Sequence, residues 1–190
     1  MNAILENYLD CNIKQFEYYK MLGEKAISQI PDPALFHKLS SESNSISIIV
    51  QNLWGDMLSR WTDFLNSDGE KSYRDRDAEF EENINTREQL MLEWNEGWSC
   101  LFDTLHSLKI EDLDKTILIR NMQHTVVDAI NRQLAHYAYH VGQIVFICKT
   151  VANENWNTLS IPKGHSKTYN EKKFAEEPHR EHFTEEYLKK

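Results

Sequence analysis

The chain has 190 residues, a formal net charge of −9 and 11% aromatic residues, with only six glycines and four prolines. This composition argues against a disordered chain and against an all-β fold, which needs many turns. The acidic balance argues against a nucleic-acid or anionic-membrane surface, because phosphate binding requires clustered Lys and Arg. We expect one mainly helical domain whose partners are small molecules or proteins.

The chain start and the cysteines indicate its compartment. The N-terminal segment has acidic residues near its start and no uninterrupted apolar stretch. Neither a signal peptide nor a membrane span is therefore expected there. Cys11, Cys100 and Cys148 are odd in number, widely spaced and embedded in helical patterns. They therefore read as reduced thiols, and a cytoplasmic location is predicted.

Two helices are expected in the first third of the chain. Residues 2–30 keep a helical apolar period, which Pro31 and Pro33 end by removing backbone donors. A second helix is predicted over residues 44–65, after several N-capping residues and before the turn residues that precede Gly69.

The polar segment 68–83 reads as a long crossover connection whose charges form a solvated face. After it, apolar residues spaced three and four apart predict a third helix over residues 84–108. Residues 115–121 carry a β-branched run too short for a helix, and we expect an extended segment there before Thr125 caps the next helix.

The fourth helix, expected over residues 125–152, has the longest apolar seam and an HxxxH pair, His136 and His140. Residues four apart on a helix lie roughly 5–6 Å apart at Cβ, so both imidazoles could reach one ion. Two structural histidines that form hydrogen bonds between helices would show the same spacing. A third ligand elsewhere in the chain would favour a metal site instead.

These elements predict an all-α fold with a bundle in residues 1–160 and a charged C-terminal extension in residues 161–190. The tail histidines His179 and His182 follow Pro178 in a charged stretch and are expected to be solvated. The residues predicted to be inside the bundle are Leu53, Met57, Trp98, Leu105, Leu134, Tyr137 and Ile144.

The strings RQLAHYAYHVGQI, NLWGDMLSRWTDFL, SDGEK, RDRDAEF and WNTLSIPKG together resemble the DinB/YfiT-like superfamily, in a branch of unknown function. The resemblance covers roughly residues 1–170. It implies a four-helix bundle, often a homodimer, in which three histidines hold a divalent metal such as zinc or nickel. Some members are thiol-dependent S-transferases or isomerases.

In that superfamily two metal ligands come from an HxxxH on the last bundle helix, which corresponds to His136 and His140. The third is a histidine on the second helix, where this chain has Asn52. An amide is a weak neutral ligand, so the metal is expected to be loosely held or absent. Asp56, one turn further along, could supply a carboxylate to a site with two histidines.

Two functions from different classes follow. The first is a metal-dependent transferase or hydrolase acting on a small molecule, with transfer of a low-molecular-weight thiol as the chemistry that the resemblance implies. The second is a metal-free binding or stress-associated bundle, as a monomer or a homodimer, in which Asn52 marks a degenerate site. Arg60 and Arg132 are candidates for holding a substrate carboxylate, although pairing with acidic residues is the commoner fate of such arginines.

Overall fold

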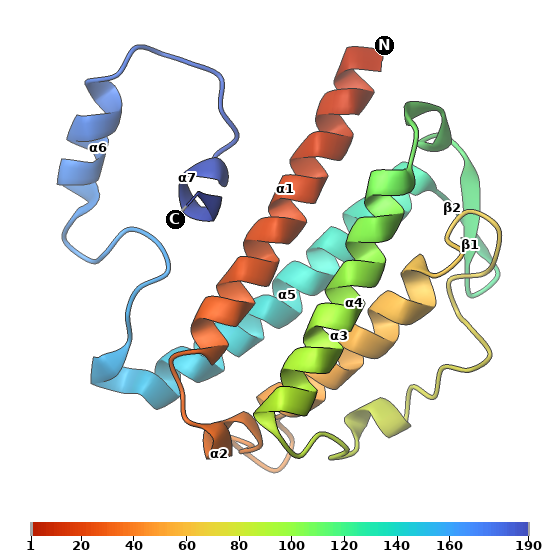
Figure 1. The fold of residues 1–190 in the computed structure, drawn as a ribbon, viewed down its shortest axis with the longest axis horizontal. Helices are drawn as coiled ribbons and strands as arrows, with labels where there is room; N and C mark the ends of the chain where they lie inside the picture. The colour runs from red at the N-terminus through yellow and green to blue at the C-terminus, as the bar shows by residue number, and fades with distance from the viewer. Residues whose placement is uncertain (1, 190) are drawn as a thin grey trace.

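The computed structural model of the protein describes residues 2–189 and is mainly helical, with one two-stranded sheet (Figure 1). The helices are α1 Asn2–Ile27, α2 Asp32–Leu35, α3 Ile46–Trp61, α4 Arg87–Ser107, α5 Val126–Ala152, α6 Ser166–Phe174 and α7 Glu185–Leu188. The strands are β1 Thr116–Ile119 and β2 Met122–Thr125, and the 3-10 turns are η1 Ala78–Phe80, η2 Ile110–Asp112 and η3 Asn153–Asn155.

The four long helices α1, α3, α4 and α5 lie side by side, with α3 packed against α4 and α5, and α1 packed against α5 and α4 (Figure 1). Each contributes one fully buried aromatic side chain to the centre of the core. Phe16 of α1 lies 6.3 Å from Trp61 of α3, 6.4 Å from Trp98 of α4 and 5.9 Å from Tyr137 of α5, measured between ring centroids. The helices thus share one core.

Side-chain caps fix where the helices begin. The hydroxyls of Ser45 and Thr86 accept hydrogen bonds from backbone N–H groups in the first turns of α3 and α4. Thr125 forms a capping box with Asp128 at the start of α5. The predicted helices are confirmed, with ends that differ by up to four residues: α3 stops at Trp61 because Thr62 is extended and Asp63 has a φ of 48°.

The extended segment predicted at 115–121 is confirmed as β1, but its antiparallel partner β2 was not predicted. Arg120 and Asn121 connect the two strands with φ angles of 54° and 59°, as expected for a two-residue type I′ turn. The Asp68 carboxylate accepts hydrogen bonds from both of their backbone N–H groups, at 2.8 Å and 2.7 Å. The hairpin is therefore attached to the crossover that follows α3.

The C-terminal extension returns to the helical body at α1 (Figure 1). The ring of Tyr18 contacts Phe183 and Tyr187, at centroid distances of 5.8 Å and 5.4 Å. Lys14 forms an ion pair of 3.0 Å with Glu185 of α7. None of the helices within residues 2–189 is long and apolar enough to cross a membrane.

The predicted core is largely confirmed, because six of the seven residues are at most 1% exposed. Leu134 differs and is only partly buried against the core. It precedes the buried Tyr137 by three residues on α5 and lies at the edge of the apolar face of that helix.

We expect Ile144→Ala to lower the free energy of unfolding by about 2–5 kcal/mol, because it opens a cavity in a fully buried site. Leu134→Ala is the matched control on the same helix and should cost about 1 kcal/mol, since the side chain is partly solvated already. Urea denaturation measures both values. A larger loss for Leu134 than for Ile144 would show that α5 is rotated from the orientation described.

Candidate functional site

A polar cavity of about 250 Å³ lies between α3, α5 and the crossover, and Asn52, Asp56 and His136 line it. His140 is not part of the lining but contacts His136, one turn away on α5. All four residues predicted from the sequence are therefore in or beside one site. Their contacts differ from a simple ring of ligands.

The two imidazoles face each other through the same ring atom, with 3.1 Å between Nε2 of His136 and Nε2 of His140. Each Nδ1 lies near an oxygen acceptor instead. Nδ1 of His140 is 2.8 Å from Oε1 of Gln143, and Nδ1 of His136 is 3.6 Å from Oδ2 of Asp56. The pair is thus oriented from both outer edges.

One assignment of the imidazole protons fits both outer contacts. A proton on each Nδ1, facing its oxygen acceptor, leaves a lone pair on each Nε2. Two lone pairs 3.1 Å apart repel each other unless a cation lies between them. Burial and the neighbouring His136 lower the pKa of His140 despite its contact with Gln143, so its neutral form is favoured. The pair can therefore take up a proton or a metal ion between the two Nε2 atoms.

Asp56 is the most connected side chain of the site and only 3% exposed. Oδ2 accepts hydrogen bonds from Gln133 Nε2 at 2.6 Å and from the Tyr137 hydroxyl at 3.1 Å, both on α5. Oδ1 accepts one from Arg74 Nη1 at 3.1 Å and lies 3.6 Å from Arg60 Nη2. This carboxylate therefore joins α3 to α5 and to the crossover.

The charges around Asp56 keep it ionised. Burial by itself would raise the pKa of this carboxyl group. The adjacent imidazole of His136 and the guanidinium groups of Arg60 and Arg74 outweigh burial and hold the pKa well below its usual range. A permanent negative charge thus faces Nδ1 of His136.

Asn52 is occupied on its nitrogen side, because Nδ2 donates a hydrogen bond of 2.7 Å to Oε2 of Glu79. Glu79 in turn accepts two hydrogen bonds from Arg74, at 2.6 Å and 3.0 Å. Gly55 permits this approach: a Cβ atom there would overlap the Glu79 carboxylate. The missing side chain of Gly55 therefore lets the crossover pack closely against α3.

The cavity has a positive lining in a protein with a net charge of −9. Asp56 is the single carboxylate among its lining residues. Arg60 is buried, and its Nε has no hydrogen-bond partner within residues 2–189. Glu70 and Glu79 also pair with arginines of the lining from outside it, but the five arginines still outnumber these three carboxylates. The lining is thus suited to an anion, for which guanidinium groups are the preferred donors. The lining arginines are Arg60, Arg74, Arg76, Arg120 and Arg132.

Sequence reasoning missed the part of the site that the crossover supplies. Segment 68–83 was expected to be a solvated face, yet the side chains of Arg74 and Glu79 are 4% and 7% exposed. The expectation holds for the exposed residues 75–77 and 80–83 but is wrong for these two, because a charged residue in a polar segment looks solvated unless its partners are known. A buried carboxylate needs a cationic partner, so the burial of Asp56 could have pointed to Arg74. That burial is known only once α3 has been placed in the fold.

The chain matches the family described as "Protein of unknown function (DUF1572)" over residues 3–165, and it belongs to that family. No curated protein and no solved structure matches it. The family description names no activity.

Asp56→Asn should lower the free energy of unfolding by about 3–5 kcal/mol, because it leaves Arg60 and Arg74 buried with less compensating charge. Asp103→Asn on the exposed side of α4 is the control and should stay within about 0.5 kcal/mol of wild type. Chemical denaturation of both variants measures the difference. Equal stabilities would mean that the buried network does not hold the crossover in place.

Proposed function

We propose that this member of a family of unknown function is a DinB-like four-helix bundle that binds a divalent metal through His136 and His140 and acts on a small anionic molecule. The observation that carries the proposal is the pair of Nε2 atoms facing each other at 3.1 Å, with both Nδ1 atoms next to oxygen acceptors. Zinc and nickel are both among the metals that imidazole ligands suit.

The donor set supports a metal. Zinc–nitrogen bonds of about 2.0–2.1 Å in a tetrahedral site separate two ligand nitrogens by about 3.4 Å, close to the spacing of the pair. Metal-bound histidines usually donate their second ring N–H to an oxygen acceptor. Gln143 is placed for this role at 2.8 Å from Nδ1 of His140, and Asp56 is the carboxylate that faces Nδ1 of His136 at 3.6 Å. Little rearrangement of α5 would be needed.

The remaining proposed ligands are weaker. Asp56 faces Nδ1 of His136, so in this proposal its main role is to orient that ring. Asn52 has its nitrogen engaged with Glu79, which leaves its amide oxygen as a neutral ligand. Two imidazoles and an amide bind less tightly than three imidazoles, and we therefore propose a loosely held metal.

The chemistry proposed is transfer of a small thiol, or a related transfer or hydrolysis. A divalent ion held by the pair would supply Lewis acidity that lowers the pKa of a thiol or water. The arginine-lined cavity would bind the anionic group of the substrate beside His136. Cys11, Cys100 and Cys148 are free thiols, which supports a cytoplasmic location, where small thiols are kept reduced.

A metal-free binding bundle, as a monomer or homodimer, is the second candidate. Within residues 2–189 no three His, Cys, Asp or Glu side chains are arranged to hold a metal. Asn52 is engaged with Glu79, and a shared proton could replace the ion between His136 and His140. In that case the arginine-lined cavity would bind its anion without a metal.

Zinc titration by calorimetry, on protein purified without chelator or nickel resin, separates the two candidates. We expect wild type to bind one zinc weakly, His140→Ala to lose binding, and Gln143→Ala to bind about tenfold more weakly because the ring loses its orienting acceptor. Asn52→His should bind more tightly than wild type by about tenfold or more, since it adds an imidazole.

His106→Ala, which removes an exposed histidine of α4, is the control and should bind as wild type does. If His140→Ala binds zinc as well as wild type, the pair is structural and the metal-free candidate replaces the first. Circular dichroism confirms that each variant is folded.

The transfer activity has its own measurement, conjugation of glutathione to monochlorobimane. We expect a rate above the uncatalysed reaction that requires added zinc or nickel and falls at least about 100-fold in His136→Ala. A metal-bound protein with no rate above background would retain the metal site and reject thiol transfer with this pair of substrates.

A further inference from the structure

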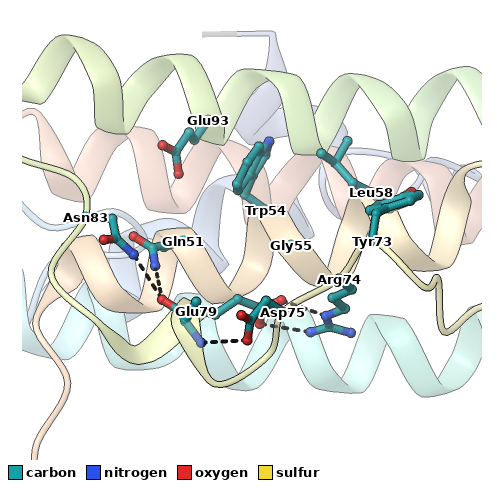
Figure 2. A pocket seen from close by; sticks show the side chains of 11 residues that line it. Gln51, Trp54, Gly55, Leu58, Tyr73, Arg74, Asp75, Glu79, Asn83 and Glu93 are labelled. Atoms are coloured by element: carbon teal, nitrogen blue, oxygen red, sulfur yellow. Dashed lines mark hydrogen bonds and ion pairs between the residues drawn. The ribbon is translucent and has the colours of Figure 1, made fainter.

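A second cavity, of about 290 Å³, lies between α3, α4 and the segment from Tyr73 to Asn83 (Figure 2). Arg74 lines both cavities, so the two share part of a wall. This cavity has an apolar side made by Trp54, Leu58 and Tyr73. The Trp54 indole N–H donates to Glu96 at 2.9 Å, which fixes the ring at the cavity.

Gln51 brings an unsatisfied acceptor to this cavity. The residue is 5% exposed, and its Nε2 donates to the carbonyl oxygens of Ala78 and Glu81 at 2.9 Å and 3.3 Å. Both partners are acceptors, so the amide cannot be turned around without losing both bonds. Oε1 is buried without a hydrogen-bond partner in the described part of the chain.

Glu93 of α4 has a second acceptor oxygen without a partner among the described residues. Its Oε1 accepts a hydrogen bond of 3.3 Å from Gln89, whereas Oε2 is buried and has no partner within residues 2–189. Figure 2 shows its carboxylate extending from α4 into the space beside Trp54, toward the helix that carries Gln51. Burial raises the pKa of Glu93, and the nearby Glu96 raises it further. The cavity lining thus has two acceptor oxygens without a donor in the described part of the chain, since the Arg74 guanidinium in the same lining is already paired with Asp56 and Glu79. Both oxygens are covered by neighbouring atoms, so a ligand would reach them by turning the partly exposed Glu93 side chain.

We propose that this cavity binds a small molecule that carries a protonated primary amine on a compact apolar body. An ammonium group has three donors and no acceptor, which complements Oε2 of Glu93 and Oε1 of Gln51. The apolar body would lie on Trp54 and Leu58. The volume is at the small end of ligand pockets, roughly 300–1,000 Å³, and suits a body of about one ring. The proposal does not depend on the metal site.

Benzylamine, benzyl alcohol and benzoate test the proposal, because they share one ring and differ in the charge and donors of the attached group. Binding is followed through the Trp54 indole N–H signal in heteronuclear NMR, assigned with Trp54→Phe. We expect benzylamine to bind wild type with a dissociation constant on the order of 1 mM, as for other fragments of this size. Benzyl alcohol should bind about tenfold more weakly, and benzoate should not bind.

Glu93→Gln keeps the shape of the side chain and removes its charge, and we expect it to weaken benzylamine binding about tenfold without changing benzyl alcohol. Glu88→Gln, an exposed glutamate of the same helix, is the matched control and should leave both unchanged. Equal binding of benzylamine and benzyl alcohol by wild type would overturn the proposal, as would binding of neither, which would mean that water satisfies the acceptors. Benzylamine binding that is insensitive to Glu93→Gln would also overturn it.

Discussion

The ion pairs of Arg74 hold this structure's functional half together. Its guanidinium group contacts Asp56 of α3 and both carboxylate oxygens of Glu79 in the same buried layer. A buried charge is costly unless it is paired and hydrogen-bonded, so removing any of the three would leave the others uncompensated. The network therefore attaches the crossover to α3, and both cavities exist only because the crossover lies there.

The same network sets the electrostatics on its two sides. Toward α5, Asp56 faces His136 while its charge is balanced by Arg60 and Arg74, and the other lining arginines leave the cavity positive. Toward α4, Gln51 and Glu93 line a cavity with an apolar wall, and each has one oxygen without a hydrogen-bond partner in the described part of the chain. Helix α3 thus lies between the arginine-lined cavity and the cavity for which a cationic ligand is proposed.

The aromatic core explains how the helices keep this geometry. Tyr137 packs against Phe16 and Trp98 and accepts a hydrogen bond of 3.0 Å from Trp61, while its hydroxyl donates to Asp56. One side chain therefore belongs to the core and to the site at once. Because Tyr137 is fully buried, the preceding residue His136 is held at the edge of the cavity.

The sequence by itself determined the helical elements, most of the core and the pairing of His136 with His140, because periodicity and i,i+4 spacing are local properties that a helix carries wherever it packs. It also pointed to Asn52 through resemblance and to Asp56 through its place one turn further along the same helix. Only the tertiary structure decided which way their polar atoms face: Asn52 toward Glu79, and Asp56 toward the outer nitrogen of His136. Arg74 and Glu79 could not be predicted, since their burial depends on partners distant in the fold, and a charged segment reads as solvated until those partners are placed.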